Sequence, residues 1–79
     1  GQNDRLYPFL IGIKQMNMFR VYDRWGNIVF DNKLATPSTG WNGTYKGNFL
    51  PAGAYVWMGE GIDVDDNVIR RSGTTILVR

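Results

Sequence analysis

Alternating runs of apolar and polar residues, separated by turns rich in glycine, proline and asparagine, organise the chain. These runs predict strands over residues 6–13, 17–23, 28–31, 53–63 and 68–79, the last with a break near 72–73. Ten glycines and three prolines leave no window of helical length that is also periodic at 3.6 residues. Short strands with a turn signal about every ten residues predict an all-β fold, either a sandwich or a small barrel.

Period two assigns the side chains of each predicted strand to its two faces. In residues 17–23, Phe19 and Val21 share one face, while the other face mixes apolar and charged side chains. Phe19 and Val21 are therefore predicted to lie in the core. Residues 53–63 carry apolar side chains on both faces, which predicts a central strand that is largely covered.

The last strand is also apolar on both faces and runs to the end of the sequence. Thr75 and Leu77 share one face, and Ile76 and Val78 share the other. A terminal strand of this kind is either buried or a contact surface suited to strand addition. With 79 residues that start at GQND and stop at TTILVR, we expect a single domain over residues 1–79, a fragment of a larger protein.

Composition narrows the chemistry available to the chain. There is no cysteine and no histidine, which removes disulfides, thiol nucleophiles, Cys-type zinc sites and imidazole bases. Ser38 and Ser72 lie in turn regions without a candidate base beside them. The net charge of +2 is scattered, unlike a nucleic-acid-binding stripe, and no apolar run approaches membrane-spanning length. We therefore expect a binding or structural module without catalytic residues or a cofactor, and no enzyme.

The stretch FRVYDRWGNIVFDN contains a turn whose Arg24 and Trp25 precede Gly26. The indole either covers the end of the core or offers an exposed platform to a sugar or a protein partner. The core position is favoured, because buried and half-buried tryptophans are far commoner than ligand platforms.

The stretch DVDDN places Asp63, Asp65 and Asn67 at the spacing of the first ligands of a calcium loop. The glycine and the glutamate that such a loop needs further on are absent, so we expect a β-hairpin tip with Asp66 and Asn67 at its strained positions and no metal site. Asn3 and Asp4 offer two more oxygen atoms, which are too few for a site and favour capping of the first strand.

Four motifs in the sequence resemble one known family. GQND, FRVYDRWGNIVFDN, GWNGTYKGNFLPAGAYVW and SGTTILVR follow, in order and over nearly the whole chain, the pattern of the gliding-motility-associated C-terminal domain of Bacteroidetes proteins, the type B sorting domain of the type IX secretion system. The sequence departs from the pattern at Asn42 (usually Asp), Trp57 (usually another aromatic) and Asp66 (often Gly). The matching residues are Tyr22, Arg24, Trp25, Gly26, Val29, Phe30, Gly40, Trp41, Gly43, Gly47, Pro51, Gly53, Tyr55, Gly73, Leu77 and Arg79.

The resemblance implies a small Ig-like antiparallel β-sandwich of about seven short strands. It also implies that the domain is a sorting signal. The host protein would cross the inner membrane by a signal peptide, and outer-membrane secretion machinery would then recognise the folded domain. The host would end up secreted or on the cell surface, without membrane insertion of this domain. The residues expected to be read by the partner are Thr75, Ile76, Leu77, Val78 and Arg79, and those expected to be structural are Tyr22, Arg24, Trp25, Gly26, Trp41, Gly43, Pro51, Gly53, Tyr55 and Gly73.

The alternative is an Ig-like adhesion module. It would bind a surface polysaccharide or another surface protein through exposed aromatic rings such as Trp25, Trp41 or Trp57. The two functions are compatible in one host protein, because one describes the cargo and the other its address.

Overall fold

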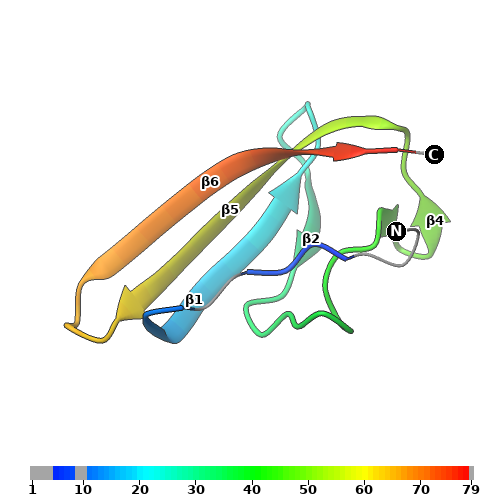
Figure 1. The fold of residues 1–79 in the computed structure, drawn as a ribbon. Coiled ribbons are helices and arrows are strands. Elements are labelled where there is room, and N and C mark those ends of the chain that lie inside the picture. Colours follow the sequence, from blue (N-terminus) through cyan, green and yellow to red (C-terminus); the bar gives the residue numbers. More distant parts are fainter. Residues whose placement is uncertain (1–4, 9–10, 79) are drawn as a thin grey trace.

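The computed structural model describes residues 5–8 and 11–78, and these residues form an all-β fold with antiparallel pairing throughout. Four strands form one sheet in the order β2-β1-β5-β6, and two short strands form a second sheet (Figure 1). The all-β antiparallel prediction is confirmed, with six strands among the described residues. The strands are β1 (Ile13–Tyr22), β2 (Ile28–Asp31), β3 (Thr44–Tyr45), β4 (Asn48–Phe49), β5 (Gly53–Asp63) and β6 (Val68–Leu77).

The core lies on one face of the four-stranded sheet, where segment 32–52 folds over it. Phe19 and Val21 are 1% and 0% exposed, which confirms their predicted place in the core. Phe30 meets Phe19 edge to face at 6.2 Å, an arrangement that aromatic pairs favour. The other buried residues of this cluster are Val29, Ala35, Trp41 and Tyr55.

Strand β1 is longer than the sequence pattern predicts, because two bulges interrupt its alternation. Its register with β5 shifts between Ile13 and Gln15 and again between Met16 and Met18. Each extra residue turns the following side chain to the opposite face. Ile13 and Met16 therefore lie on the same side of the sheet as Phe19 although they are three residues apart, so a pattern of period two does not include the start of β1.

The predicted strand over residues 6–13 is wrong. Leu6 forms an isolated bridge in which its N–H donates to Trp41 O and its C=O accepts from Trp41 N, both at 2.8 Å. Pro8 has no N–H to continue a ladder, and a turn at Ile11 and Gly12 precedes β1. Residues 9–10 lie outside the described part of the chain.

Strands β2 and β5 have the predicted bounds, whereas two other expectations are corrected. β6 runs without a break through Gly73, which lies opposite Trp57 and under its ring, so the glycine serves packing and not a turn. β5 is central but covered on one face only, since Val56 and Met58 are 40% and 38% exposed.

The β3–β4 hairpin was not predicted. Its turn consists of Lys46 and Gly47, with φ angles of 51° and 82°. Positive φ at both central residues is the geometry of a two-residue hairpin turn. Lys46-Gly47 between Tyr45 and Asn48 is a signal for a two-residue hairpin turn. Strands of only two residues show no alternation that would predict them from the sequence.

Candidate partner-recognition site

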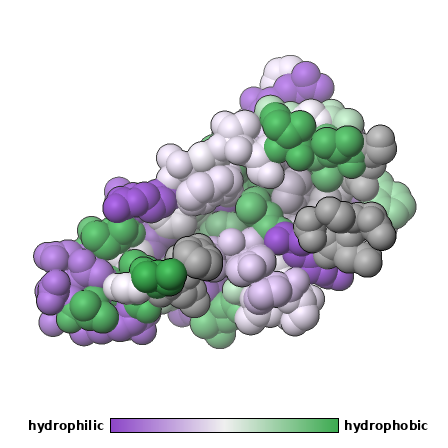
Figure 2. All heavy atoms as spheres, viewed as in Figure 1, coloured by the Kyte–Doolittle hydropathy of each residue, from purple (hydrophilic) through white to green (hydrophobic). Residues whose placement is uncertain are grey.

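The end of β6 holds the residues that the sequence singled out for partner recognition. Thr75 and Leu77 are half-buried, and Leu77 packs against the core cluster. Ile76 and Val78 are 63% and 78% exposed. Leu77 therefore fixes the strand to the domain while its two neighbours present apolar side chains to solvent, and Figure 2 shows hydrophobic residues gathered over this end of β6. Arg79 lies outside the described residues.

The face of the sheet opposite the core is open, and apolar side chains gather on it near the end of β6. The register brings Tyr22 opposite both Ile28 and Val56 and brings Ala54 opposite Ile76. Ile28 is 42% exposed and Val56 is 40% exposed. An apolar surface thus continues from the end of β6 across β5 and β1 to β2, and we call it the open apolar face.

Toward the β5–β6 turn the same open face becomes polar. Arg70 Nε donates to Glu60 Oε1 at 2.7 Å, and Asn17 Nδ2 donates to Glu60 Oε2 at 3.3 Å. The hydrogen bond from Arg70, followed by that from Asn17, holds the pKa of Glu60 below its ordinary value. The open face therefore has two halves of different chemistry, and the apolar half adjoins the end of the chain.

The turns that close the two long hairpins are built alike. In 23–27 the N–H of Asp23 donates to Asn27 O at 3.0 Å, and in 63–67 the N–H of Asp63 donates to Asn67 O at 2.9 Å. In both turns the first aspartate also accepts hydrogen bonds from the backbone N–H groups two and four residues later. This pattern is a type I turn followed by a left-handed residue.

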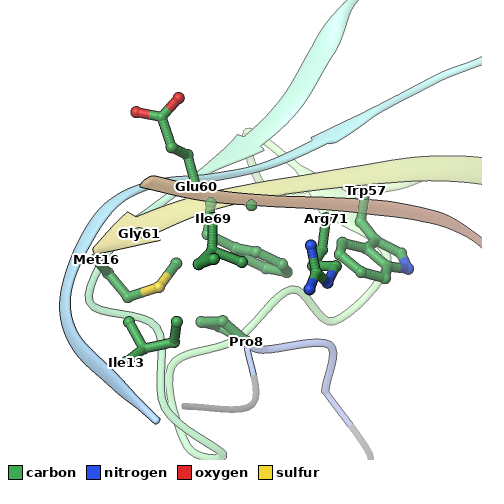
Figure 3. Close-up of a pocket in the computed structure, with 10 residues that line it drawn as sticks. Pro8, Ile13, Met16, Trp57, Glu60, Gly61, Ile69 and Arg71 are labelled. Atoms are coloured by element: carbon green, nitrogen blue, oxygen red, sulfur yellow. The ribbon is translucent and has the colours of Figure 1, made fainter. Parts of the chain in front are cut away.

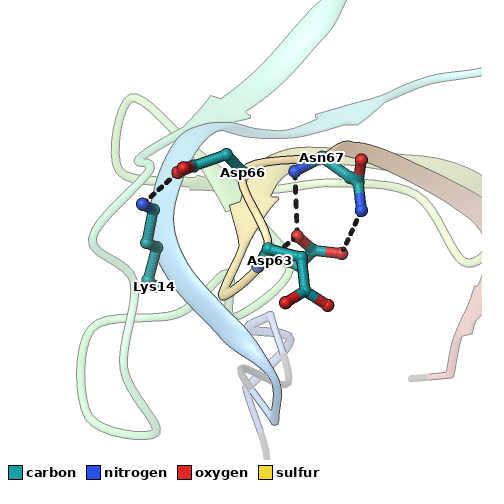
Figure 4. A network of polar contacts seen from close by, with 5 residues as sticks. Lys14, Asp63, Asp66 and Asn67 are labelled. Atoms are coloured by element: carbon teal, nitrogen blue, oxygen red, sulfur yellow. Dashed lines mark hydrogen bonds and ion pairs between the residues drawn. The ribbon is translucent and has the colours of Figure 1, made fainter.

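The left-handed residue is a glycine in one turn and an aspartate in the other. Gly26 has φ 83° and Asp66 has φ 67°. The predicted hairpin tip is confirmed, with Asp66 at a strained position. The expected strained position of Asn67 is wrong, because Asn67 does not have a positive φ; its side-chain amide donates to Asp63 Oδ2 at 3.4 Å. Asp66 also forms an ion pair with Lys14 on β1, which joins this turn to the sheet (Figure 4).

Both leading aspartates are held in their charged form. The N–H of Asn67 is the main cause that lowers the pKa of Asp63 below its ordinary value. For Asp23 desolvation is the largest influence and raises the pKa, but hydrogen bonds from Asn27 and Trp25 together outweigh it, so the pKa is lowered. The aspartates therefore serve as acceptors for turn N–H groups.

The favoured core position of Trp25 is wrong. Its side chain is 78% exposed at the tip of the first turn, with Arg24 Cζ 5.5 Å from the ring centroid. The turn hydrogen bonds use only the backbone of Trp25, so nothing draws the ring back over the core. Of the other tryptophans, Trp41 is buried and Trp57 is half-buried, which leaves Trp25 as the exposed one.

Several family-motif residues meet in one cluster between the two sheets. The rings of Trp41 and Tyr55 are 5.0 Å apart, and Trp41 Nε1 donates to Thr44 O at 3.1 Å. The hydroxyl of Tyr55 donates to Pro51 O at 2.6 Å. Gly43, with φ 87°, accepts at its C=O from the N–H of Leu50. This cluster holds segment 32–52 against the sheet.

The remaining motif residues lie outside this cluster. Gly53, with φ 143°, begins β5 opposite Leu77, and Gly73 lies under the ring of Trp57. Tyr22 ends β1 on the open face. A Cβ added at Gly40 would lie 2.4 Å from Leu6 O, so Gly40 allows the bridge between Leu6 and Trp41.

A hollow of about 220 Å³ opens on the core side of the sheet and was not predicted (Figure 3). Gly59 and Gly61 lie on the same face of β5 as Trp57 and leave room beside its ring. Their alternate spacing in the sequence was the available signal. Figure 3 shows Glu60 pointing away from the hollow and Arg71 beside Trp57. The hollow suits an apolar group, and Glu60 is the one carboxylate among the described residues that line it.

No group of three or more histidine, cysteine, aspartate or glutamate side chains is placed to hold a metal ion in the described part of the chain. No helix long and apolar enough to cross a membrane occurs in residues 5–8 and 11–78.

Comparison with protein families gives a match over most of the chain. The model of the CHU_C type IX secretion signal domain matches residues 1–74. The match includes both similar turns and the Trp41 cluster, and the last residues of β6 follow it. Searches among curated proteins and among solved structures find no match.

Proposed function

The chain belongs to the type IX secretion signal domain family, and from that premise we propose that the end of β6 is what the secretion machinery recognises. The domain is a C-terminal secretion signal, and its host protein is secreted or attached to the cell surface. The proposed recognition residues are Thr75, Ile76, Leu77, Val78 and Arg79. Their partner is a protein of the outer-membrane machinery.

The observation that carries the proposal is the exposure of Ile76 on β6 and of Val78 directly after it, on either side of Leu77, which packs against the core cluster. Exposed aliphatic side chains on a rigid strand lose little conformational entropy when they are buried by a partner. The open apolar face enlarges the surface that a partner can cover. Exposed apolar residues that adjoin one another are typical of protein interaction sites.

The proposal extends to the host protein. We propose that residues 1–79 form a single domain of a larger Bacteroidetes protein, without catalytic activity of its own. The motif residues around Trp41, Tyr55 and Pro51 would then keep the domain folded during export and leave recognition to β6. A gliding-motility protein or an adhesin is the kind of host that we propose.

An export assay in a Bacteroidetes host tests this function. The chain is fused behind a signal peptide and a fluorescent protein, and a double variant, Ile76→Ser with Val78→Ser, is compared with the native chain. Val68→Ser is the matched control, because Val68 is 62% exposed at the other end of the same strand. We expect fluorescence outside the cell for the native chain and the control, and retention in the periplasm for the double variant.

Two further arms decide the outcome. A strain without the type IX translocon should retain all three proteins, and circular dichroism should show that the purified double variant is folded. Export of the folded double variant at the native level would reject the end of β6 as the recognised part. Export of the native chain without the translocon would reject the secretion route itself.

A second candidate function rests on Trp25. An indole that is 78% exposed beside Arg24 is suited to stack on a sugar ring or to enter a protein interface. We propose adhesion to a surface polysaccharide or another surface protein as the alternative function. Titration with polysaccharides should then change the tryptophan fluorescence of the native chain and not that of Trp25→Leu. An unchanged signal in the native chain would remove this alternative.

A further inference from the structure

The hydrogen bonds of the second turn determine which backbone groups of β6 point outward. Asp63 and Asn67 are a hydrogen-bonded pair, and bonded pairs alternate along an antiparallel ladder. The register with β5 then makes Ile69, Gly73 and Leu77 members of bonded pairs. The even-numbered residues of β6, which include Arg70, Ser72, Thr74 and Ile76, consequently direct their N–H and C=O groups away from β5.

A side-chain contact supports this assignment. Arg71 Nη1 donates to the C=O of Arg70 at 2.8 Å, as expected for a carbonyl that points away from β5 and is accessible to a side chain. β6 is the last strand in the sheet order and lies beside β5 alone among the described strands. Among the described residues, no other strand contacts the outer edge of β6. A row of unpaired backbone groups of this kind is a template for another strand.

We infer that an extended segment of the secretion machinery adds to the outer edge of β6 as a further strand. The inference rests on the proposed function and specifies how the end of β6 is recognised. Backbone hydrogen bonds to Ser72, Thr74 and Ile76 would supply affinity, as in other complexes formed by strand addition. The apolar side chains of the added strand would lie beside Ile76 and Val78 on the open apolar face.

Charge indicates what else the added strand carries. β6 contains Arg70 and Arg71 and no acidic residue. Arg70 is already paired with Glu60, whereas the guanidinium of Arg71 lies at the outer edge against the C=O of Arg70. An acidic side chain on the partner strand would complement Arg71. A second copy of this chain would instead bring its own two arginines to the same ladder, and cross-strand like charges are unfavourable.

Proline substitutions separate edge pairing from side-chain recognition. Thr74→Pro removes an outward N–H and leaves the ladder with β5 intact, a position where edge strands tolerate proline. Thr74→Ala is the matched control, because it keeps the N–H. In the export assay we expect Thr74→Pro to lower the exported fraction about tenfold, which corresponds to about 1.4 kcal/mol, and Thr74→Ala to stay near the native level. Thr75→Pro, which removes an inward N–H, should unfold the strand and serves as the reference for a folding defect.

Charge reversal tests the partner chemistry in the same assay. Arg71→Glu should lower export about tenfold, whereas Arg71→Lys and Lys46→Glu, in the β3–β4 turn, should not. Unfolding in urea shows whether each variant is folded. If Thr74→Pro is itself unfolded, Ser72→Pro replaces it, because Ser72 has a second outward N–H and lies outside the proposed recognition residues.

The outcomes distinguish the inference from the function on which it rests. Native export by a folded Thr74→Pro chain, combined with loss of export in Ile76→Ser with Val78→Ser, would overturn strand addition and leave the proposed function standing. If neither Thr74→Pro nor Ile76→Ser with Val78→Ser loses export, both strand addition and the proposed function are overturned. Analytical ultracentrifugation of the native chain should show a monomer, and a dimer that Thr74→Pro dissociates would make a second copy the occupant and overturn the choice of partner.

Discussion

The two faces of the four-stranded sheet carry similar apolar side chains but differ in how far these are buried. On the covered face Val21 is fully buried beneath segment 32–52, whereas on the open face Val56 is 40% exposed. These valines lie on neighbouring strands, and each is adjacent in sequence to a residue that pairs with the other. Hydrophobic composition therefore does not decide which face becomes the core. The position of the covering segment decides it, and the face left open is available to a partner.

The largest expected effect comes from removing the side chain that holds the cover in place. Trp41→Ala should lower the free energy of unfolding by about 3–5 kcal/mol, because it deletes a buried ring and its hydrogen bond to Thr44. Trp25→Ala is the matched control and should change it by no more than about 0.5 kcal/mol. Urea unfolding measures both. A loss below about 1 kcal/mol for Trp41→Ala would show that the covering segment is not held by this ring.

The same substitution on the two faces compares them directly. Val21→Thr places a hydroxyl in the core without a partner and should cost about 1–3 kcal/mol. Val56→Thr leaves the hydroxyl in contact with water and should change stability by no more than about 0.5 kcal/mol. Thermal unfolding of both variants measures the difference. Equal losses would mean that the open face is covered in solution.

A smaller effect is expected from one added methyl group on the covered face. A Cβ at Gly73 would lie 2.8 Å from Trp57 Nε1, so Gly73→Ala must displace the ring. We expect a loss of about 1 kcal/mol, at the lower end of the cost of overpacking because the half-buried ring can move. Ser72→Ala, on the open face of the same strand, should be nearly neutral. A more stable Gly73→Ala would show that the ring does not rest on β6.

The smallest effect concerns the polar half of the open face. The folded-state pKa of Glu60 lies below the unfolded value of about 4.3, so its contribution to stability is complete above that value and is lost as the pH falls through the folded-state pKa. Glu60→Gln should therefore reduce the loss of stability between about pH 5 and 3, seen as a smaller shift of the urea midpoint. Asp23 and Asp63 keep lowered pKa values in the variant, so part of the pH dependence should remain. An unchanged pH profile would show that the Glu60–Arg70 pair contributes nothing to the fold.

Local signals in the sequence were sufficient for some elements of the fold. The bounds of β2 and β5 follow from clear alternation between turn residues, and the positions of Phe19 and Val21 follow from period two. The start of β1 did not follow, because the bulges near Lys14 and Asn17 replace period two with a spacing of three. A bulge depends on how two distant strands are aligned, which a single run of residues does not reveal.

The candidate site was predictable in the same partial way. An apolar terminal strand pointed to β6, but whether Ile76 or Leu77 faces solvent depends on which side the cover occupies. The core position of Trp25 follows only from how often tryptophans are buried, and its turn uses backbone groups and leaves the ring exposed. Which backbone groups of β6 point outward follows only from the hydrogen bonds of the second turn together with the strand register. Long-range arrangement accounts for the gaps on β6, and the local geometry of the turn accounts for Trp25.

The two similar turns also bear on the order in which the domain folds. Each turn joins strands that are neighbours along the chain, β1 with β2 and β5 with β6, and isolated hairpins form in about 1–10 μs. Pairing of β1 with β5 must instead close the long segment between them, and long-range closure slows folding. The hairpin that carries β6 is therefore expected to form before the core is complete. A full-length chain that refolds would then pass through a state in which the β5–β6 hairpin is formed and segment 32–52 does not yet cover the sheet.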